Sequence, residues 1–495
     1  MGILIFRRIA PFCVSFYLVE YPAFSTDEMF YVMKAQCWEE NNIPCIYGRG
    51  GGAWPEFTNP PALSWSWIII FRVFGISPFV VRMFILLLGL LNLLVVFLIG
   101  KELGGKEDPD KGNFIALVSG LVLALDSELV YYSRIGYLDN PMNFFSTCFL
   151  LFYLRYLRTH QTRFAWLAGL AAGIGLWFKL SILFILLGLG IYIFLTWQIE
   201  GPLRVQAMIF AFLILYVQWG VDTDPVGFAN GTIYQVTKDA DADPAFFWEE
   251  VILGNNIRSL FLFSVLIPFF YYNNRNNVFA ESSILIFSLF LGLMIMFSNT
   301  RTLFSYYLAG FASIYAILYA ISVYFGITLL YNCLSSEYEK YLKSSLITFP
   351  HHNSTRRTIW LGILLVCIVA VLLEPHYAMN NIKSKYPPNY ISKENQEYLE
   401  IMSFILDRIS KHNTIVAPLE IGPWLNASGY HVWNTWLNSS TPDWVVRDYI
   451  IQYDPDYLVL HQEYYNIQNG LGYYKIGVFP NYFVLENLDI SWRDS

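Results

Sequence analysis

The chain has 495 residues, of which 56% are hydrophobic, 18% aromatic and only 14% charged. Soluble domains carry about 25% charged residues, so this much apolar surface cannot be buried inside one globule, and lipid is the solvent that suits it. The net charge of −7 argues against a nucleic-acid partner, because binding nucleic-acid phosphates needs clustered Lys and Arg.

Apolar segments of bilayer length recur along the chain and predict an α-helical polytopic membrane protein with about 11 transmembrane helices. If the N-terminus is cytosolic, basic residues gather in the loops on the cytosolic side of the membrane. This distribution follows the positive-inside rule and places the C-terminal segment outside. The predicted spans are 9–24, 78–100, 113–131, 141–157, 163–178, 180–198, 205–221, 257–272, 279–297, 303–331 and 359–374.

The first outer loop, residues 25–77, begins with the acidic stretch TDE. Residues 26–40 have helical periodicity and predict an amphipathic helix that lies on the bilayer, with a stripe of Met29, Val32, Met33, Gln36 and Cys37. Ser25 and Glu28 have the spacing of a capping box, which gives Glu28 a structural explanation. Asp27 is not required by that box, although the helix dipole favours an acid at this position.

The remainder of this loop contains three further features. Cys37 and Cys45 form a disulfide only if the loop faces an oxidising compartment, which the sequence leaves open. GRGGGAW (48–54) lacks the preceding strand and following Lys-Ser/Thr of a phosphate-binding loop, so we expect a flexible loop with Arg49 as a candidate phosphate ligand. In TNPPALSW (58–65), two prolines favour an extended segment before a juxtamembrane helix at 62–75, which is too short to span a bilayer.

The second outer loop contains YYSRIGYLDNPMNFF (131–145). Pro141 is typical of a helix start, and Asp139 or Asn140 would then be the N-cap. Arg134 at a helix end needs an anionic partner, either Asp139 or a phosphate group. Just before this loop, Asp126 and Glu128 have the spacing of an acid-x-acid metal motif, so a divalent metal stays an open alternative while no cofactor is required.

Lys179 divides the long apolar segment 163–198 into two halves of bilayer length. A lysine at mid-bilayer costs several kcal/mol, so we predict that Lys179 lies in a tight turn on the outer face. A single charged residue at a helix end usually snorkels or caps. Carboxylates and cations grouped on one face, however, indicate a site that handles a lipid-linked phosphate.

The C-terminal segment, residues 375–495, has thirteen acidic and eight basic residues, a net charge of −5. Helical periodicity over 394–411 and short strands at 414–418, 457–461 and 482–486 predict an α/β domain. We therefore expect two domains, a transmembrane catalytic domain over 1–374 and an extracytoplasmic α/β domain over 375–495.

Five motifs resemble, in order, the pattern of the GT-C membrane glycosyltransferases: TDE, NPPAL, RMFILLLGLLNLLVVFLIGKEL, SRIGYLDNPM and GLAAGIGLWFKLSILF. The branch they resemble most is the protein O-mannosyltransferases and their bacterial and archaeal relatives, which include the lipid A aminoarabinose transferases. The resemblance covers roughly residues 10–200. SYYLAGFASIYAIL (305–318) is similar to a later Tyr-rich helix of the family, and the C-terminal segment is only generically similar.

The resemblance implies a polyprenyl- or dolichyl-phosphate sugar as donor. Asp27 matches the first-loop acid proposed as catalytic base, with Glu28 beside it. Lys179 matches the lysine that contacts the lipid phosphate, and Arg134 with Asp139 matches the R…LD pair of the second outer loop.

The sequence departs from the family pattern at two places. Ser305 stands where an Arg is expected before Tyr306, which leaves Arg301 as the candidate replacement for phosphate binding. Asn59 stands before the two prolines, where the family has an HxP-like variant, so contacts to the acceptor stay open.

The predicted function is an inverting glycosyltransferase that moves a hexose such as mannose, or a pentose, to a protein, glycan or lipid acceptor. Its site would face outward from the cell membrane, or into the lumen of the endoplasmic reticulum in a eukaryote. An oligosaccharyltransferase-like enzyme is an alternative within the fold, although the DxD-type pair and WWDYG-like motif are missing. A membrane transporter or lipid flippase and an inactive assembly protein are alternatives of other classes, but the charges lie at helix ends and no inverted repeat is visible.

Overall fold

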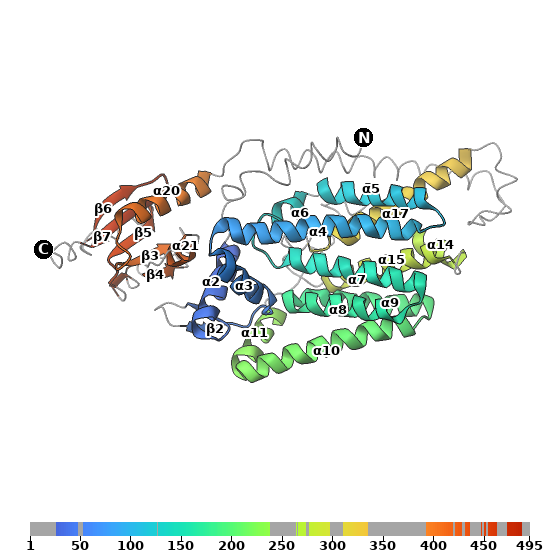
Figure 1. The fold of residues 1–495 in the computed structure, drawn as a ribbon, viewed down its shortest axis with the longest axis horizontal. Coiled ribbons are helices and arrows are strands. Elements are labelled where there is room, and N and C mark those ends of the chain that lie inside the picture. Colours follow the sequence, from blue (N-terminus) through green and yellow to red (C-terminus); the bar gives the residue numbers. More distant parts are fainter. Residues whose placement is uncertain are drawn as a thin grey trace.

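The structure is a computed structural model and describes residues 26–47, 53–125, 127–237, 264, 266–273, 277–297, 310–334, 393–418, 421–427, 431–435, 447, 450–451, 454–462 and 473–487. These residues form a bundle of apolar helices with a smaller unit of sheet and helices at one end (Figure 1). The predicted spans 9–24 and 359–374 lie outside the described residues.

The bundle consists of rod-like helices that lie side by side (Figure 1). Its helices are α4 (Pro78–Gly104), α5 (Pro109–Leu125), α7 (Asp139–Thr159), α8 (Thr162–Phe178), α9 (Phe184–Thr196), α10 (Glu200–Thr223), α14 (Leu266–Asn273), α15 (Val278–Phe297) and α17 (Ala312–Leu334). Within the described residues, three helical segments are long and apolar enough to cross a membrane, namely Pro78–Gly104, Glu200–Thr223 and Val278–Met296. The expected count of about 11 spans therefore stays a prediction.

Small residues allow neighbouring helices of the bundle to approach closely. A Cβ added to Gly100 of α4 would lie 2.3 Å from backbone atoms of Ala116 in α5, and one added to Gly188 of α9 would lie 2.7 Å from the Leu289 Cα in α15. Lipid tails are as apolar as the helix surfaces, so no hydrophobic driving force favours contact between helices. Helices in lipid associate instead through close packing of this kind. These glycines therefore set how tightly α4 packs on α5 and α9 on α15.

Short elements cover the end of the bundle at which α4 and α7 begin. They are α2 (Thr26–Asn41), β1 (Cys45–Tyr47), β2 (Ala53–Pro55), α3 (Ala62–Phe74), α6 (Ser127–Tyr132) and α11 (Pro225–Thr237). The juxtamembrane helix predicted at 62–75 is thus present as α3. A disulfide joins Cys37 of α2 to Cys45 of β1, which answers the question that the sequence left open.

Helix α2 does not lie on a bilayer surface as expected, because protein covers its apolar stripe. Met29, Val32 and Met33 are 0% exposed, and they belong to a buried cluster that also contains residues of the C-terminal unit. The Gln36 side chain donates a hydrogen bond from Nε2 to the Pro423 carbonyl at 3.0 Å. The helix is present, but residues 32–37 are all buried, so protein surrounds it on every side and it is not amphipathic as predicted.

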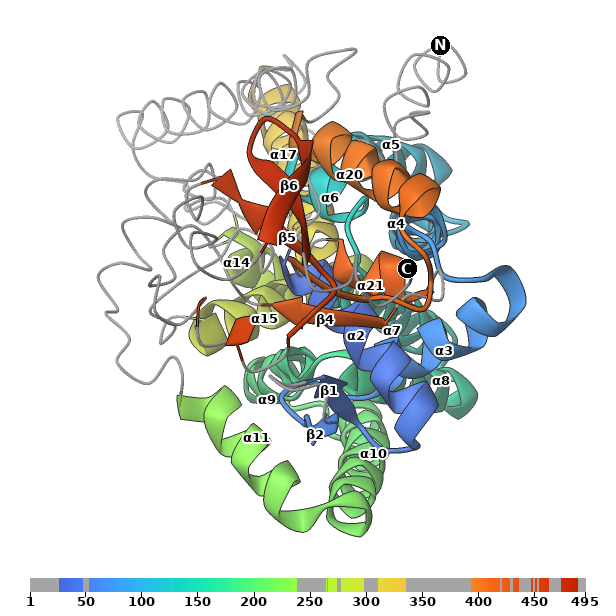
Figure 2. The same cartoon turned by 90° about the vertical axis from the view of Figure 1, so that its left-hand side faces the viewer.

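The C-terminal unit contains a five-stranded sheet in the order β4-β3-β5-β7-β6. Strand β3 is parallel to β4 and β5, whereas β7 is antiparallel to β5 and β6. Figure 2 shows the sheet and α20 in front of the bundle end that carries α2 and α3. The elements are α20 (Lys393–Arg408), β3 (Thr414–Pro418), α21 (Gly422–Ala427), β4 (His431–Thr435), β5 (Tyr457–His461), β6 (Tyr473–Val478) and β7 (Tyr482–Asn487).

Candidate active site at the outer end of the bundle

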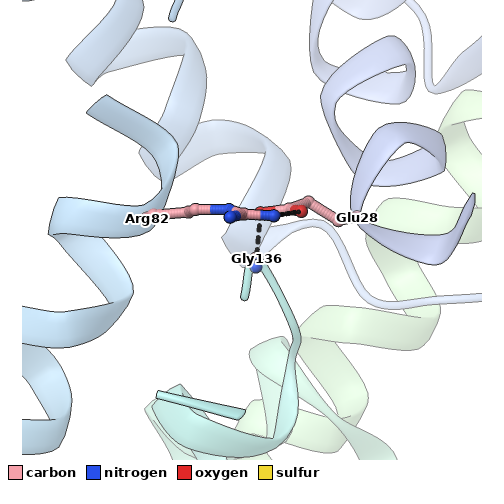
Figure 3. Close-up of polar contacts among 3 residues, drawn as sticks. All are labelled: Glu28, Arg82 and Gly136. Carbon is pink, nitrogen blue, oxygen red and sulfur yellow. Dashed lines mark hydrogen bonds and ion pairs between the residues drawn. The ribbon is translucent and has the colours of Figure 1, made fainter. Parts of the chain in front are cut away.

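A buried ion pair joins the first turn of α2 to the first turns of α4 (Figure 3). Arg82 Nε donates to Glu28 Oε1 at 2.9 Å and Arg82 Nη2 donates to Glu28 Oε2 at 2.7 Å, and both side chains are 0% exposed. The Gly136 backbone N–H donates to the same Oε1 at 3.1 Å. The Glu28 carboxylate thus has partners on α4 and on the second outer loop, and Ser25, its predicted capping-box partner, lies outside the described residues.

Gly136 is the residue that lets this loop reach Glu28. A Cβ at this position would lie 3.0 Å from the Trp67 ring and from Val81, tighter than ordinary van der Waals contact. The loop backbone therefore lies directly against α3 and α4. Asp27 precedes Glu28 in the same turn of α2, so the buried pair anchors the turn that carries the predicted base.

A second ion pair joins the start of α7 to the end of α8. Lys179 Nζ lies 2.6 Å from Asp139 Oδ1, with the Lys179 side chain 15% exposed and the Asp139 side chain 2% exposed. Helix α8 ends at Phe178, Lys179 is extended with φ −153°, and a 3₁₀ turn over Leu180–Leu183 leads into α9. The predicted break of the long apolar segment at Lys179 is therefore confirmed.

The start of α7 differs from the prediction that Asp139 or Asn140 is its N-cap. The helix begins at Asp139, and the N-cap residue is Leu138, which makes no side-chain cap hydrogen bond. The physical reason is that the Lys179 ammonium holds the Asp139 carboxylate. Pro141 lies in the first turn, where its missing N–H costs no helical hydrogen bond, as expected.

Aromatic contacts bring α2 and the loop of Arg134 together. Tyr31 of α2 contacts Tyr137 with ring centroids 6.4 Å apart, and Tyr137 contacts Tyr132 at 5.4 Å. Arg134 lies between these two tyrosines of the loop in sequence and is buried, at 6% exposed. Asp139, one of the two partners considered for Arg134 from the sequence, is bound by Lys179.

Half-buried tryptophans connect the first outer loop to the end of α8. Trp65 of α3 lies 5.2 Å from Trp177 of α8 between ring centroids, and Trp38 of α2 lies 5.8 Å from Trp219 of α10. Trp177 is two residues before Lys179. Together with the two ion pairs, these contacts place α2, α3, the second outer loop and Lys179 at one end of the bundle.

Lys34 of α2 is a buried cation that the sequence reasoning missed. Its side chain is 1% exposed, and Nζ donates to the Asn59 carbonyl at 3.2 Å. Burial lowers the pKa of Lys34 to about 8, and the Glu56 carboxylate opposes this shift by raising it. The signal for Lys34 was its spacing, since a residue seven positions after Asp27 lies on nearly the same face of a helix.

Arg82 was read from the sequence only as one of several charged residues at outer helix ends. Its role depends on Glu28, which lies 54 residues earlier in the chain. No local pattern links two residues at that distance, so only the fold could reveal the pair.

Several predicted site residues take no part in the contacts above. Arg49, Asp126, Arg301 and Tyr306 lie outside the described residues, and Glu128 belongs to α6. Asn59 lies beside Lys34 through its carbonyl oxygen. Within the part of the chain that the structure describes, no group of three or more His, Cys, Asp or Glu residues could hold a metal ion.

Comparison with known proteins supports the family resemblance. Residues 58–220, about a third of the chain, match the family model of dolichyl-phosphate-mannose-protein mannosyltransferases. No curated protein sequence matches the chain.

Solved structures match over nearly the whole chain. ArnT from Cupriavidus metallidurans bound to undecaprenyl phosphate is 14% identical with a TM-score of 0.62, and covers 98% of this chain and 97% of its own. The apo form of ArnT is also 14% identical, with a TM-score of 0.63 and the same coverage. The apo oligosaccharyltransferase from Archaeoglobus fulgidus is 13% identical with a TM-score of 0.51, and covers 97% of this chain and 74% of its own.

At these identities the likeness shows the fold. The chain has the fold of the GT-C membrane glycosyltransferases, as the motifs predicted, and its apolar helices are those of a membrane protein.

Proposed function

We propose that this protein is a glycosyltransferase that moves a sugar from a polyprenyl- or dolichyl-phosphate donor to an acceptor hydroxyl on the outer face of the membrane. The observation that carries the proposal is the convergence of α2, Arg134 and the Asp139–Lys179 pair at one end of the bundle. The family match over residues 58–220 includes Arg82, Arg134 and Lys179.

The roles follow from the chemistry of the side chains. Asp27 takes the proton of the acceptor hydroxyl as its oxygen attacks the anomeric carbon. The bond between the anomeric carbon and the phosphate oxygen breaks, and the lipid phosphate leaves with the electron pair. Lys179 and Arg134 stabilise the negative charge of the departing phosphate. A single displacement of this kind inverts the configuration at the anomeric carbon.

Asp139 and the donor phosphate would share Lys179. The ammonium has three N–H donors, and the Asp139 carboxylate takes one of them at 2.6 Å. Lys179 is the more exposed member of the pair, at 15% against 2%, so a phosphate can approach it without displacing Asp139. Asp139 then lies beside the sugar, and Asn59, on the loop that leads into α3, is the proposed contact for the acceptor.

The side of the membrane is part of the proposal. The Cys37–Cys45 disulfide lies in the same loop as Asp27, and disulfides persist in oxidising compartments. Together with the positive-inside pattern, this supports a site outside the cell membrane, or in the lumen of the endoplasmic reticulum in a eukaryote. We further propose that the sugar is a hexose such as mannose, or a pentose. The acceptor is a protein, a glycan or a lipid.

The test is transfer by the purified, full-length protein from defined polyprenyl-phosphate sugars. Asp27→Asn should lower kcat by about 100-fold or more, because the general base is lost. Lys179→Ala should raise the KM for the donor, because the phosphate loses a cation. Lys106→Ala, in the loop between α4 and α5, and Asp110→Asn, in the first turn of α5, change exposed residues, and these matched controls should keep full activity.

Full transfer by a folded Asp27→Asn variant would remove Asp27 as the base, and unchanged donor KM in Lys179→Ala would remove Lys179 from the phosphate site. Lipid translocation without any sugar transfer would favour the flippase alternative.

A further inference from the structure

The start of α7 buries two asparagines whose side chains have no polar partner among the residues that the structure describes. Asn140 and Asn143 are both 0% exposed. Among the described residues, neither the Oδ1 nor the Nδ2 atom of either side chain has a hydrogen-bond partner. A buried polar group left unpaired costs about 1–3 kcal/mol. Four such atoms in one helical turn are a large cost, which is explained if a ligand satisfies them.

The comparison with Asn92 of α4 shows how an asparagine that joins helices behaves in this bundle. Asn92 is also 0% exposed, but its Nδ2 donates to Ser313 Oγ of α17 at 2.8 Å. An asparagine that holds membrane helices together has such a partner across the interface. Asn140 and Asn143 have none among the described residues, so helix association does not explain them.

The two amides lie next to the proposed phosphate site. Asn140 follows Asp139 directly, and Asn143 lies four residues after it, one helical turn or about 5.4 Å along α7. Asp139 is 2.6 Å from Lys179 Nζ. A sugar whose phosphate contacts Lys179 is bonded directly to that phosphate, so the proposal places its ring along the first turns of α7, where Asp139 and Asn143 share a helix face.

A small cavity lies beside Gly89 of α4, and Asn140 is not among the residues that line it. It has a volume of about 40 Å³, and its single polar lining residue is Ser133 of the second outer loop. A Cβ added to Gly89, which also lines the cavity, would lie 3.4 Å from Asn140 Nδ2 and 3.0 Å from Ser133 Cβ. Gly89 therefore lets the Asn140 amide and Ser133 lie close against α4.

We propose that Asn140 and Asn143 bind hydroxyl groups of the donor sugar and thereby determine which sugar the enzyme accepts. The inference rests on the proposed function. Each carboxamide offers two N–H donors and one carbonyl acceptor, which complement hydroxyl groups that both donate and accept. A site built to hydrogen-bond hydroxyl groups discriminates strongly against a ligand that lacks one of them.

The charges of the side chains around the amides also indicate the class of sugar. An amino sugar carries a positive charge that needs a carboxylate, and Asp139, the carboxylate next to the amides, is bound by Lys179. The two amides are neutral. The sugar of the donor is therefore an uncharged hexose or pentose with free hydroxyl groups.

The experiment compares Asn140→Leu and Asn143→Leu with the wild-type protein on polyprenyl-phosphate donors that differ in one hydroxyl configuration, such as mannose against glucose. We expect kcat/KM for the preferred sugar to fall about 10- to 100-fold and the ratio between the epimers to fall at least 10-fold. Binding of polyprenyl phosphate without a sugar should stay unchanged. The melting temperature should stay unchanged or rise, because an apolar side chain replaces an unpaired amide.

Asn92→Leu is the matched control and should lower the melting temperature without changing the epimer ratio, because it breaks the bond to Ser313. If a leucine variant does not fold, Asn140→Ser and Asn143→Ser keep a polar group at each position and should still lower the epimer ratio.

Folded variants with an unchanged epimer ratio would overturn this inference, as would equal loss of binding for sugar-bearing and sugar-free lipid. The proposed function fails separately, if the wild-type protein transfers no sugar from any lipid-phosphate donor.

Discussion

At the scale of single residues, the proposed phosphate site depends on the ion pair between Lys179 and Asp139, whose Nζ and Oδ1 atoms lie 2.6 Å apart. Lys179 could be placed at an outer turn from the sequence, because a lysine within a long apolar segment is costly anywhere else. Its partner Asp139 could not be identified, because 40 residues separate the two. Whether Asp139 caps α7 or forms an ion pair depends on Lys179, which the residues around Asp139 do not reveal.

Lys34 should make stability depend on pH in a defined direction. Its pKa is lowered by burial from 10.5 to about 8. Below pH 8 both the folded and the unfolded chain keep the proton, so stability does not change. Between pH 8 and 10.5 the unfolded state binds more protons, so the free energy of unfolding should rise with pH, by up to about 3 kcal/mol.

The measurement is the free energy of unfolding in detergent, compared between the wild-type protein and Lys34→Met from pH 7 to 10.5. The difference between the two should grow in favour of the wild-type protein above pH 8. Lys106→Met, at an exposed position, should give a constant difference over the same range. A constant difference for Lys34→Met as well would show that its ammonium titrates normally.

At the scale of elements, periodicity predicted the helices and strands well and their surroundings poorly. The helix at 26–40, the short helix at 62–75 and the three strands of the C-terminal segment are present as α2, α3, β3, β5 and β7. The expected location of α2 on the bilayer was wrong, because a hydrophobic stripe does not specify what buries it. Strands β4 and β6 were not predicted. HVWNT contains only two apolar residues, and in YYKIGV the apolar Tyr474 and Val478 are exposed while Gly477 is buried, so the apolar pattern does not mark the buried face.

The Glu28–Arg82 pair clamps α2 to α4, and removing one partner should be costly. Glu28→Gln removes the Glu28 charge from the buried Arg82 guanidinium, so we expect a loss of about 3–5 kcal/mol of stability. Glu28→Met combined with Arg82→Met removes both charges and should recover part of that loss. Thermal unfolding in detergent measures both effects.

The exposed pair between Arg72 and Glu39 is the matched control, because the Arg72 side chain is 65% exposed. Glu39→Gln should cost less than about 1 kcal/mol. Equal effects of Glu28→Gln and Glu39→Gln, or a double variant no more stable than Glu28→Gln, would contradict the clamp.

At the scale of the whole molecule, the C-terminal unit packs against the helix that carries the predicted base. Gln36 of α2 binds the Pro423 carbonyl at the start of α21, and one buried cluster contains residues of α2, α3, α20 and β3. The fold class was predictable because composition and motif order pointed to a GT-C membrane protein. The docking of the C-terminal unit on α2 was not, because it depends on contacts between residues 387 positions apart.

The measurement that tests the central claim most directly is the anomeric configuration of the sugar in the product, determined by NMR after transfer from a polyprenyl-phosphate sugar of known configuration. A single displacement with Asp27 as base predicts a product whose anomeric configuration is the inverse of the donor's. A product that retains the configuration of the donor, or no product from any lipid-phosphate sugar, would contradict the account.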